Sequence, residues 1–228
     1  MSKVSEKIKG IENQIEKALW DVELHGELEK ALEIYQDAEA KLNSLGVNVD
    51  HPAYAEQQRV LSYCLMRQGN LLRQIEKPRE AYELGEREII AARASGNEIT
   101  LARSLMSNGT NYIVMGDIER GLKLIEEARM LYEKGDSHDH QQGLGWYWIL
   151  QADLANAGLI RREPNEVIEL TTRALDILKP IENWPGVARA FAARAKAHEK
   201  LGDEQQASKD RLEQQVYEGR ISPEEETD

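Results

Sequence analysis

Glycine residues that follow apolar, helix-periodic segments recur along the whole chain and limit what it can fold into. Six of them occupy positions where a helix commonly ends on a left-handed residue: Gly26, Gly46, Gly96, Gly116, Gly135 and Gly202. Five of the six prolines, at positions 52, 78, 164, 180 and 185, also fall where these segments meet. Strong helix formers dominate between the stops, and aromatic residues make up only 6% of the chain. The pattern predicts an all-α protein.

The stops divide the chain into ten expected helices. Their ranges are about 3–24, 27–45, 51–75, 78–95, 98–115, 118–134, 141–161, 164–179, 185–201 and 204–218. Short connections favour antiparallel packing of consecutive helices. We therefore expect five antiparallel pairs, at about 3–46, 51–96, 98–135, 141–180 and 185–218, within a single domain over residues 1–219.

The third pair contains the most specific motif of the sequence. Gly109 and Tyr112, followed by Gly121, Ile125 and Ala128, match the spacing W-x2-L-G-x2-Y and A-x3-F of tetratricopeptide repeats. Small residues are needed where two helices cross, because a large side chain would hold the backbones apart. The sequence thus resembles the tetratricopeptide repeat (TPR) family.

The repeats of this chain are longer than the 34 residues typical of that family. Aligning the pairs on the first small position of the second helix gives steps of 50, 40, 46 and 40 residues, for Ala31, Ala81, Gly121, Val167 and Ala207. In this respect the chain resembles the longer-looped repeats of maltose-activator-type bacterial regulators and of kinesin light chain. The resemblance implies a right-handed superhelical solenoid whose first helices line a concave groove.

The resemblance also implies which residues line that groove. Projecting the family's inner positions onto this chain gives nine candidate ligand-binding residues: Trp20, Tyr63, Asn70, Arg73, Arg103, Met106, Asn156, Arg189 and Lys196. Other projected positions include Glu16, Glu23, Met66, Thr110, Ile113, Ile149 and Ala152. A guanidinium presents a planar fork of donors that suits carboxylates, so the inward arginines favour an acidic partner. The alternative is that these arginines pair with acidic neighbours or are simply solvated.

Two amides in the groove, Asn70 and Asn156, are spaced for hydrogen bonds to the backbone of an extended peptide. A known variant of the family grips a C-terminal carboxylate through a two-carboxylate clamp, of which only Asn70 is matched here. Met66, Ser107, Ile149 and Asp153 occupy the other clamp positions. Binding of a chaperone tail is therefore not the expected function.

Several other kinds of chemistry are not indicated. The net charge of −12 disfavours nucleic acid and anionic membranes, which both require a surplus of Lys and Arg. No apolar stretch approaches about 18 residues and no leader is visible, so the expected location is the cytoplasm. The lone Cys64 lies in an apolar run and is expected to be buried. We find no nucleotide-binding, nucleophile or zinc-protease motif, so we expect neither an enzyme nor a cofactor.

Three further features receive a plain interpretation. His138, Asp139 and His140 offer at most half of a metal site, and we expect an exposed polar loop there and no metal. Trp146 and Trp148 must point to different faces of a helix, so Trp146 is expected in the core and Trp148 stays a candidate ligand platform. Residues 220–228 are expected to form a disordered acidic tail, and an alternative is that this tail visits the basic groove.

These features predict a non-catalytic scaffold that binds an extended peptide or an acidic tail of a partner protein in its concave groove. The alternative is a regulatory sensor or coupling module that binds a signalling peptide or a small metabolite. Self-association through an exposed apolar face of a terminal repeat is a further expectation left open by the sequence.

Overall fold

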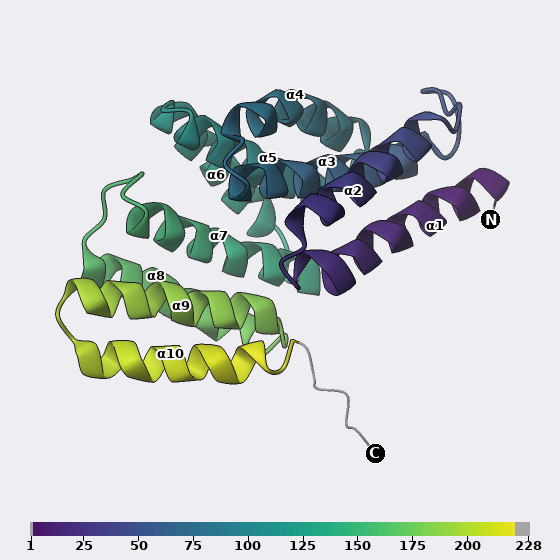
Figure 1. Cartoon of the computed structure of the whole chain (residues 1–228). Coiled ribbons are helices and arrows are strands. Elements are labelled where there is room, and N and C mark those ends of the chain that lie inside the picture. Colours follow the sequence, from purple (N-terminus) through teal and green to yellow (C-terminus); the bar gives the residue numbers. More distant parts are fainter. Residues whose placement is uncertain (1, 222–228) are drawn as a thin grey trace, which may run out of the picture. The chain divides into compact units, whose positions relative to one another are not determined.

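A computed structural model of the chain describes residues 2–221 (Figure 1). Within these residues it contains ten α-helices and one short π-helix, and no β-strand. The helices are α1 (Lys3–Ala18), α2 (Leu28–Asn43), α3 (Tyr54–Gln74), α4 (Pro78–Ala94), α5 (Glu98–Val114), α6 (Ile118–Tyr132), α7 (His138–Asn156), α8 (Pro164–Leu178), α9 (Trp184–Lys200) and α10 (Glu204–Glu218), and the π-helix is η1 (Leu19–Glu23). No helix in this part of the chain is both long and apolar enough to cross a membrane.

Most of the predicted helix ends are confirmed. Five of the six glycines expected at helix ends have φ between 64° and 95°, the left-handed conformation that favours glycine. Gly135 was expected to be the sixth, but it is not among the residues with positive φ. Gly158 instead has a φ of 74° and follows α7, which is why this helix ends at Asn156 and not near residue 161.

The segment with His138, Asp139 and His140 is a correction to the sequence analysis. These residues form the first turn of α7 and not a loop, and Ser137 is the residue that precedes the helix. His140 Nδ1 lies 2.7 Å from Ser137 Oγ, so this imidazole is oriented by the start of the helix. Among residues 2–221, no three His, Cys, Asp or Glu side chains gather closely enough to hold a metal ion.

The chain divides into two compact units, Met1–Ala128 and Arg129–Asp228, with the boundary inside α6. Consecutive helices pack on one another in each unit: α1 on α2 and α3 on α4 in the first, and α7 on α8 and α9 on α10 in the second. The expected helix pairs are therefore present. The single domain over residues 1–219 stays a prediction.

In the first unit, the motif glycines lie at the crossing of α5 and α6, as predicted. A Cβ added at Gly109 would lie 2.7 Å from the carbonyl oxygen of Gly121, and one added at Gly121 would lie 2.5 Å from the carbonyl oxygen of Gly109. Ile125 and Ala128 are fully buried beside this crossing. Cys64 is buried too, and its thiol donates a hydrogen bond to the carbonyl oxygen of Tyr35.

In the second unit, small residues on α7 again allow large side chains to pack closely. A Cβ added at Gly143 would lie 2.0 Å from the ring of Tyr132, and one at Gly145 would lie 2.4 Å from Leu178. Trp146 packs partly buried against the apolar cluster that contains Phe191. Of the predicted acidic tail, residues 222–228 lie outside the described residues, while 220 and 221 form a turn after α10.

Candidate functional site

Seven of the projected positions of the first unit are half-buried side chains on two packed helices. On α3 and α5, half-buried side chains recur every three or four residues, and α3 contacts α5 directly. We call this surface the α3–α5 wall, and it consists of Tyr63, Met66, Asn70, Arg73, Arg103, Met106 and Thr110. Side chains of this kind are accessible to a ligand and yet held in place by neighbours.

Four projected positions do not line a surface, so the projection is wrong for them; one is Glu23 of η1, which is buried, and the others lie on α5 and α7. Ile113 is 2% exposed and lies against Gly121, because it belongs to the crossing of α5 and α6. Ile149 and Ala152 of α7 are buried in the core of the second unit. The projected register is therefore wrong near the end of α5 and in the middle of α7, while along α3 it stays a prediction.

Arg73 is the most unusual residue of the α3–α5 wall. Its guanidinium donates hydrogen bonds to the side-chain oxygens of Asn70 and Asn111, and both contacts are partly buried. Within residues 2–221, no carboxylate lies within ion-pair distance of it. Burial lowers the pKa of the Arg73 guanidinium to about 10, and Glu88 opposes this shift, so the group stays cationic at neutral pH. Arg73 is thus a desolvated cation whose direct partners are two neutral amides.

Helices α4 and α5 pack closely near Arg73 because Gly85 of α4 has no side chain. The Asn111 amide also donates to the carbonyl oxygen of Ala81 on α4, at 3.0 Å. A Cβ at Gly85 would lie only 1.9 Å from Asn108 Oδ1 and 3.1 Å from Asn111 Nδ2. The family motif has a large aromatic residue at the position of Gly85, and here the two asparagine side chains fill that space.

A buried carboxyl group from α4 contacts the face of α5 that also carries Asn111. Glu88 of α4 is 1% exposed and accepts hydrogen bonds from Ser107 Oγ at 3.0 Å and Asn108 Nδ2 at 3.3 Å. Its other oxygen, Oε1, is buried without a partner in the described part of the chain, and so is Ser104 Oγ. Burial raises the pKa of Glu88 to about 8, although Ser107 and Arg73 oppose this shift. Glu88 is therefore mostly protonated at neutral pH.

These buried polar residues were missed by sequence reasoning, although the sequence contains a signal for them. Ser104, Ser107, Asn108 and Asn111 are spaced i, i+3, i+4 and i+7, which is the period of the buried face of a helix. Polar side chains at apolar positions must be hydrogen-bonded when they are buried. Their recurrence on α5 could have predicted a polar network behind the wall.

Trp20 lies in η1, which contacts α1 and α2. Its side chain is 46% exposed, one helical turn beyond Glu16. Burial raises the pKa of Tyr63 to about 12, while Arg67 lowers it and Glu16 adds to the rise. The charges of Glu16 and Arg67 therefore act on the ring that begins the α3–α5 wall.

The π-helix itself was not predicted, and it turns a carboxylate inward. Glu23 is buried, and it accepts hydrogen bonds from the hydroxyl of Tyr35 at 2.7 Å and from Nε of Arg67 at 3.2 Å. A π-helix shifts the side chains that follow it relative to an α-helix, and the apolar period does not reveal such a shift. In contrast to Arg73, Arg67 has a buried carboxylate as its partner.

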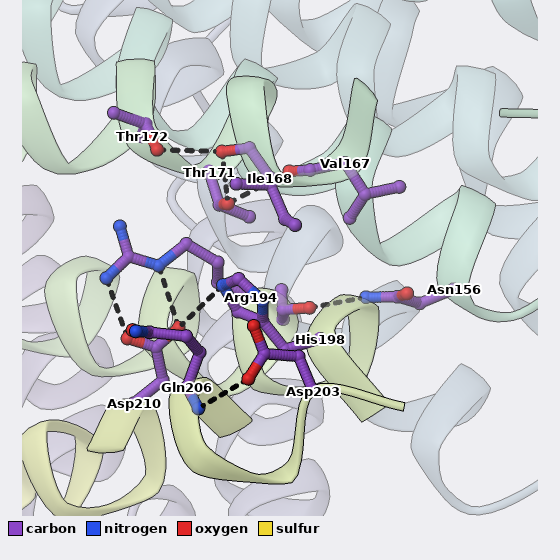
Figure 2. A network of polar contacts seen from close by, with 11 residues as sticks. Asn156, Val167, Ile168, Thr171, Thr172, Arg194, His198, Asp203, Gln206 and Asp210 are labelled. Atoms are coloured by element: carbon purple, nitrogen blue, oxygen red, sulfur yellow. Dashed lines mark hydrogen bonds and ion pairs between the residues drawn. The ribbon is translucent and has the colours of Figure 1, made fainter. Parts of the chain in front are cut away.

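Two of the three candidate residues of the second unit, Arg189 and Asn156, form hydrogen bonds with neighbouring groups. Arg189 Nε donates to Asp153 at 2.9 Å, and Lys196 is exposed on the same helix, α9. Asn156 of α7 donates to the carbonyl oxygen of Ala193 at 2.8 Å (Figure 2). This pairing matches the alternative stated above for Arg189, and ligand binding by the three residues stays a prediction.

Figure 2 also shows a paired network between α9 and α10. Arg194 donates two hydrogen bonds to the Asp210 carboxylate, at 2.8 and 2.7 Å, and His198 Nε2 lies 3.8 Å from the same group. Asp210 is almost fully buried, so it and Arg194 form a matched ion pair that joins the two helices.

Trp148, the candidate ligand platform on α7, is half-buried, and the Arg173 guanidinium lies 5.1 Å from its ring centroid.

Comparison with known proteins identifies the fold. No protein-family model matches the sequence, and no curated protein matches it either. Among solved structures, BtubC (BKLC) from P. vanneervenii has a TM-score of 0.56 at 14% identity, and the match covers 97% of this chain and 93% of that chain. A structure described as kinesin light chain nearly identical TPR-like repeats, from Podosopora anserina, has a TM-score of 0.48 at 15% identity, covering 98% and 100%. The second score is too low to add to the assignment.

The helix pairs, the motif glycines at their crossing and the likeness to BtubC agree with one another. The fold of this chain is of the TPR-like, all-α repeat type. Proteins with the same fold serve many functions, so the fold does not settle what this chain binds. The function has to be argued from the α3–α5 wall.

Proposed function

We propose that the chain is a non-catalytic protein-interaction module that binds an extended, carboxylate-bearing segment of a partner protein on the α3–α5 wall. The observation that supports this proposal is the state of Arg73. Its cationic guanidinium is partly buried, is oriented by Asn70 and Asn111, and lacks a carboxylate partner within residues 2–221.

The argument rests on the cost of burying a charge. A cation that leaves bulk water loses solvation, and neutral amide oxygens replace that solvation only in part. A carboxylate from a ligand would supply the missing opposite charge through a charge-assisted hydrogen bond. Arg73 has five N–H groups, of which the two hydrogen bonds to Asn70 and Asn111 occupy two. Three N–H groups therefore remain as donors for a ligand.

The rest of the α3–α5 wall suits the other side chains of an extended segment. Met66 and Met106 are half-buried on neighbouring helices, and a thioether adapts its shape to different apolar groups. Tyr63 adds an aromatic ring at the start of the α3–α5 wall. Exposed Trp20 is a further candidate anchor, because large aromatic side chains often dominate the binding energy at protein interfaces.

The overall charge agrees with a protein partner recognised at a local site. The chain carries a net charge of −12, so an acidic partner is repelled at long range and needs a local cation to bind. Repulsion of this kind lowers nonspecific association and makes the contact at Arg73 more selective. The same net charge disfavours nucleic acid as a ligand.

The proposal is tested by selecting random peptides on the immobilised full chain. We expect the selected peptides to be enriched in Asp and Glu, and we expect this enrichment to disappear with Arg73→Gln. The matched control is Arg87→Gln, because Arg87 lies on α4 outside the wall and already pairs with Glu39. Enrichment that is equal in wild type and Arg73→Gln, or selection without any acidic preference, would contradict the proposal.

A further inference from the structure

The carboxyl group of Glu88 and the guanidinium of Arg73 are bound to the same face of α5. Glu88 accepts from Ser107 and Asn108, and Arg73 donates to Asn111. Positions three or four residues apart on a helix lie one turn apart, at about 5–6 Å. The two side chains therefore approach α5 from α4 and α3, about one helical turn from each other.

Glu88 has one oxygen that an added proton would suit. Oε2 accepts two hydrogen bonds, whereas Oε1 is buried without a partner in residues 2–221. In the same described part of the chain, Ser104 Oγ is also buried without a hydrogen bond of normal geometry, but it lies near enough to the Glu88 carboxyl group to lower the pKa of that group. A protonated Oε1 would gain a nearby acceptor, while an ionised Oε1 would stay poorly solvated.

Among the charged groups of the neighbouring helices, Arg73 is the one whose charge acts on Glu88. The helices that contact α4 include α3 and α5. The other arginines of α3 are held elsewhere, since Arg59 binds Glu12 and Arg67 binds Glu23. On α5 the groups that contact Glu88 are the neutral Ser104, Ser107 and Asn108, and the charge of Arg103 acts on Tyr63.

From this geometry we propose that Glu88 is a proton-operated regulator of ligand binding at Arg73. While Glu88 is protonated, the charge of Arg73 is uncompensated, and the wall binds a ligand carboxylate. Once Glu88 ionises, its negative charge partly compensates the positive charge of Arg73. A ligand carboxylate is then attracted less strongly, and its binding becomes weaker. This regulation rests on the proposed function, because it concerns the same carboxylate-binding site.

The direction of the pH effect follows from which form is present. Burial raises the pKa of Glu88 to about 8, so the proton is bound below this pH and is lost above it. Carboxylate binding should therefore be strong near pH 6.5 and should weaken as the pH rises to 9.5. By linkage, binding of a carboxylate near pH 8 should also take up protons from the solution.

The test measures binding of an acetylated, amidated tetraglutamate peptide to the full chain by calorimetry at pH 6.5, 8.0 and 9.5. The side chains of this probe are ionised throughout this range, since their ordinary pKa is about 4.3. For wild type we expect the affinity to fall by up to about thirtyfold from pH 6.5 to 9.5, because each pH unit above the pKa lowers the protonated fraction about tenfold and pH 9.5 lies about 1.5 units above the pKa of Glu88.

Glu88→Gln keeps the shape and the accepting oxygen of the side chain and resembles its protonated form. This variant should bind at pH 6.5 like wild type and should keep that affinity at pH 9.5. The matched control is Glu86→Gln, which removes an exposed carboxylate from the same helix and should keep the pH dependence of wild type.

The possible results separate the two proposals. Binding by wild type that is independent of pH, or an equal pH dependence in Glu88→Gln, would overturn the regulation by Glu88 and leave the binding site at Arg73 intact. Absence of binding at pH 6.5, or unchanged binding in Arg73→Gln, would overturn the proposed function and the regulation with it.

Discussion

Arg73 in the first unit and Arg194 in the second are both partly buried arginines, and they differ in what they contact. Arg194 forms a two-pronged ion pair with the Asp210 carboxylate, whereas Arg73 donates to the amide oxygens of Asn70 and Asn111. A buried ion pair with its hydrogen bonds satisfied is complete without a ligand. The contrast teaches that an inward-facing arginine indicates a binding site only when the chain does not itself supply the anion.

The largest effect expected from one substitution at a single pH concerns the ion pair of Arg194 and Asp210. Asp210→Ala should lower the free energy of unfolding by about 3 kcal/mol, because it leaves Arg194 without its buried partner. Chemical denaturation with urea measures this change. Glu204→Ala on the same helix, whose side chain is exposed, is the control and should have little effect. A denaturation midpoint for Asp210→Ala equal to that of wild type would show that the ion pair of Arg194 and Asp210 does not stabilise the fold.

The second effect concerns the protonation of Glu88, whose neighbour Arg73 has no carboxylate within ion-pair distance in residues 2–221. The pKa of this carboxyl group is about 8 in the folded protein and near 4.5 when unfolded, so the folded state holds the proton more tightly. The stabilisation is fully present below pH 4.5 and is lost as the pH rises to 8. Wild type should therefore lose roughly 1 kcal/mol per pH unit relative to Glu88→Gln over that window. A difference in unfolding free energy that is constant from pH 5 to pH 8 would contradict this account.

A third prediction tests whether the contacts of Arg73 and Glu88 with α5 depend on close packing of α4 against α5. Gly85→Ala places a Cβ where Asn108 now lies and should cost about 2 kcal/mol of stability. It should also weaken the binding of acidic peptides, because Asn111 is displaced together with Asn108. Gly69→Ala is the matched control, since its Cβ would meet Arg73 at an ordinary 3.9 Å. Equal stability of the two variants would show that α4 and α5 tolerate a larger separation.

The smallest effect on stability is expected at Arg73 itself. Arg73→Met removes a cation that lacks an anionic partner, so the free energy of unfolding should change by less than about 1 kcal/mol. Arg194→Met should cost more, because it leaves the Asp210 carboxylate buried and unpaired. Urea denaturation of the two variants side by side makes this comparison. A greater loss for Arg73→Met than for Arg194→Met would mean that Arg73 is a structural residue.

The fold could be predicted in detail because its determinants are local. Glycines at helix ends and the Gly109 and Gly121 crossing need only short-range spacing, and both patterns are visible in the sequence. Local spacing failed where tertiary contacts decide, as at Gly135 and at the first turn of α7. The π-helix η1 also escaped prediction, because one extra residue in a turn leaves no mark on the apolar period.

The candidate site could be predicted only in part. The family register selected Arg73 and Asn70, and both side chains are half-buried on α3, but their place in a groove stays a prediction. What these side chains contact could not be predicted, because Glu88 and Asn111 come from other helices. Whether an arginine selected by the register meets a carboxylate, as Arg189 does, or an amide, as Arg73 does, depends on those long-range contacts.

The central claim is that Arg73 is a cation prepared for a ligand carboxylate and Arg194 is not. The most direct measurement follows the side-chain 15N–1H signals of both arginines by nuclear magnetic resonance while the tetraglutamate peptide is added to the full chain at pH 6.5. We predict that the Nε–H signal of Arg73 shifts and saturates with the peptide concentration, while that of Arg194 stays in place. An Arg73 signal that does not move at saturating peptide, or equal shifts of both signals, would contradict the claim.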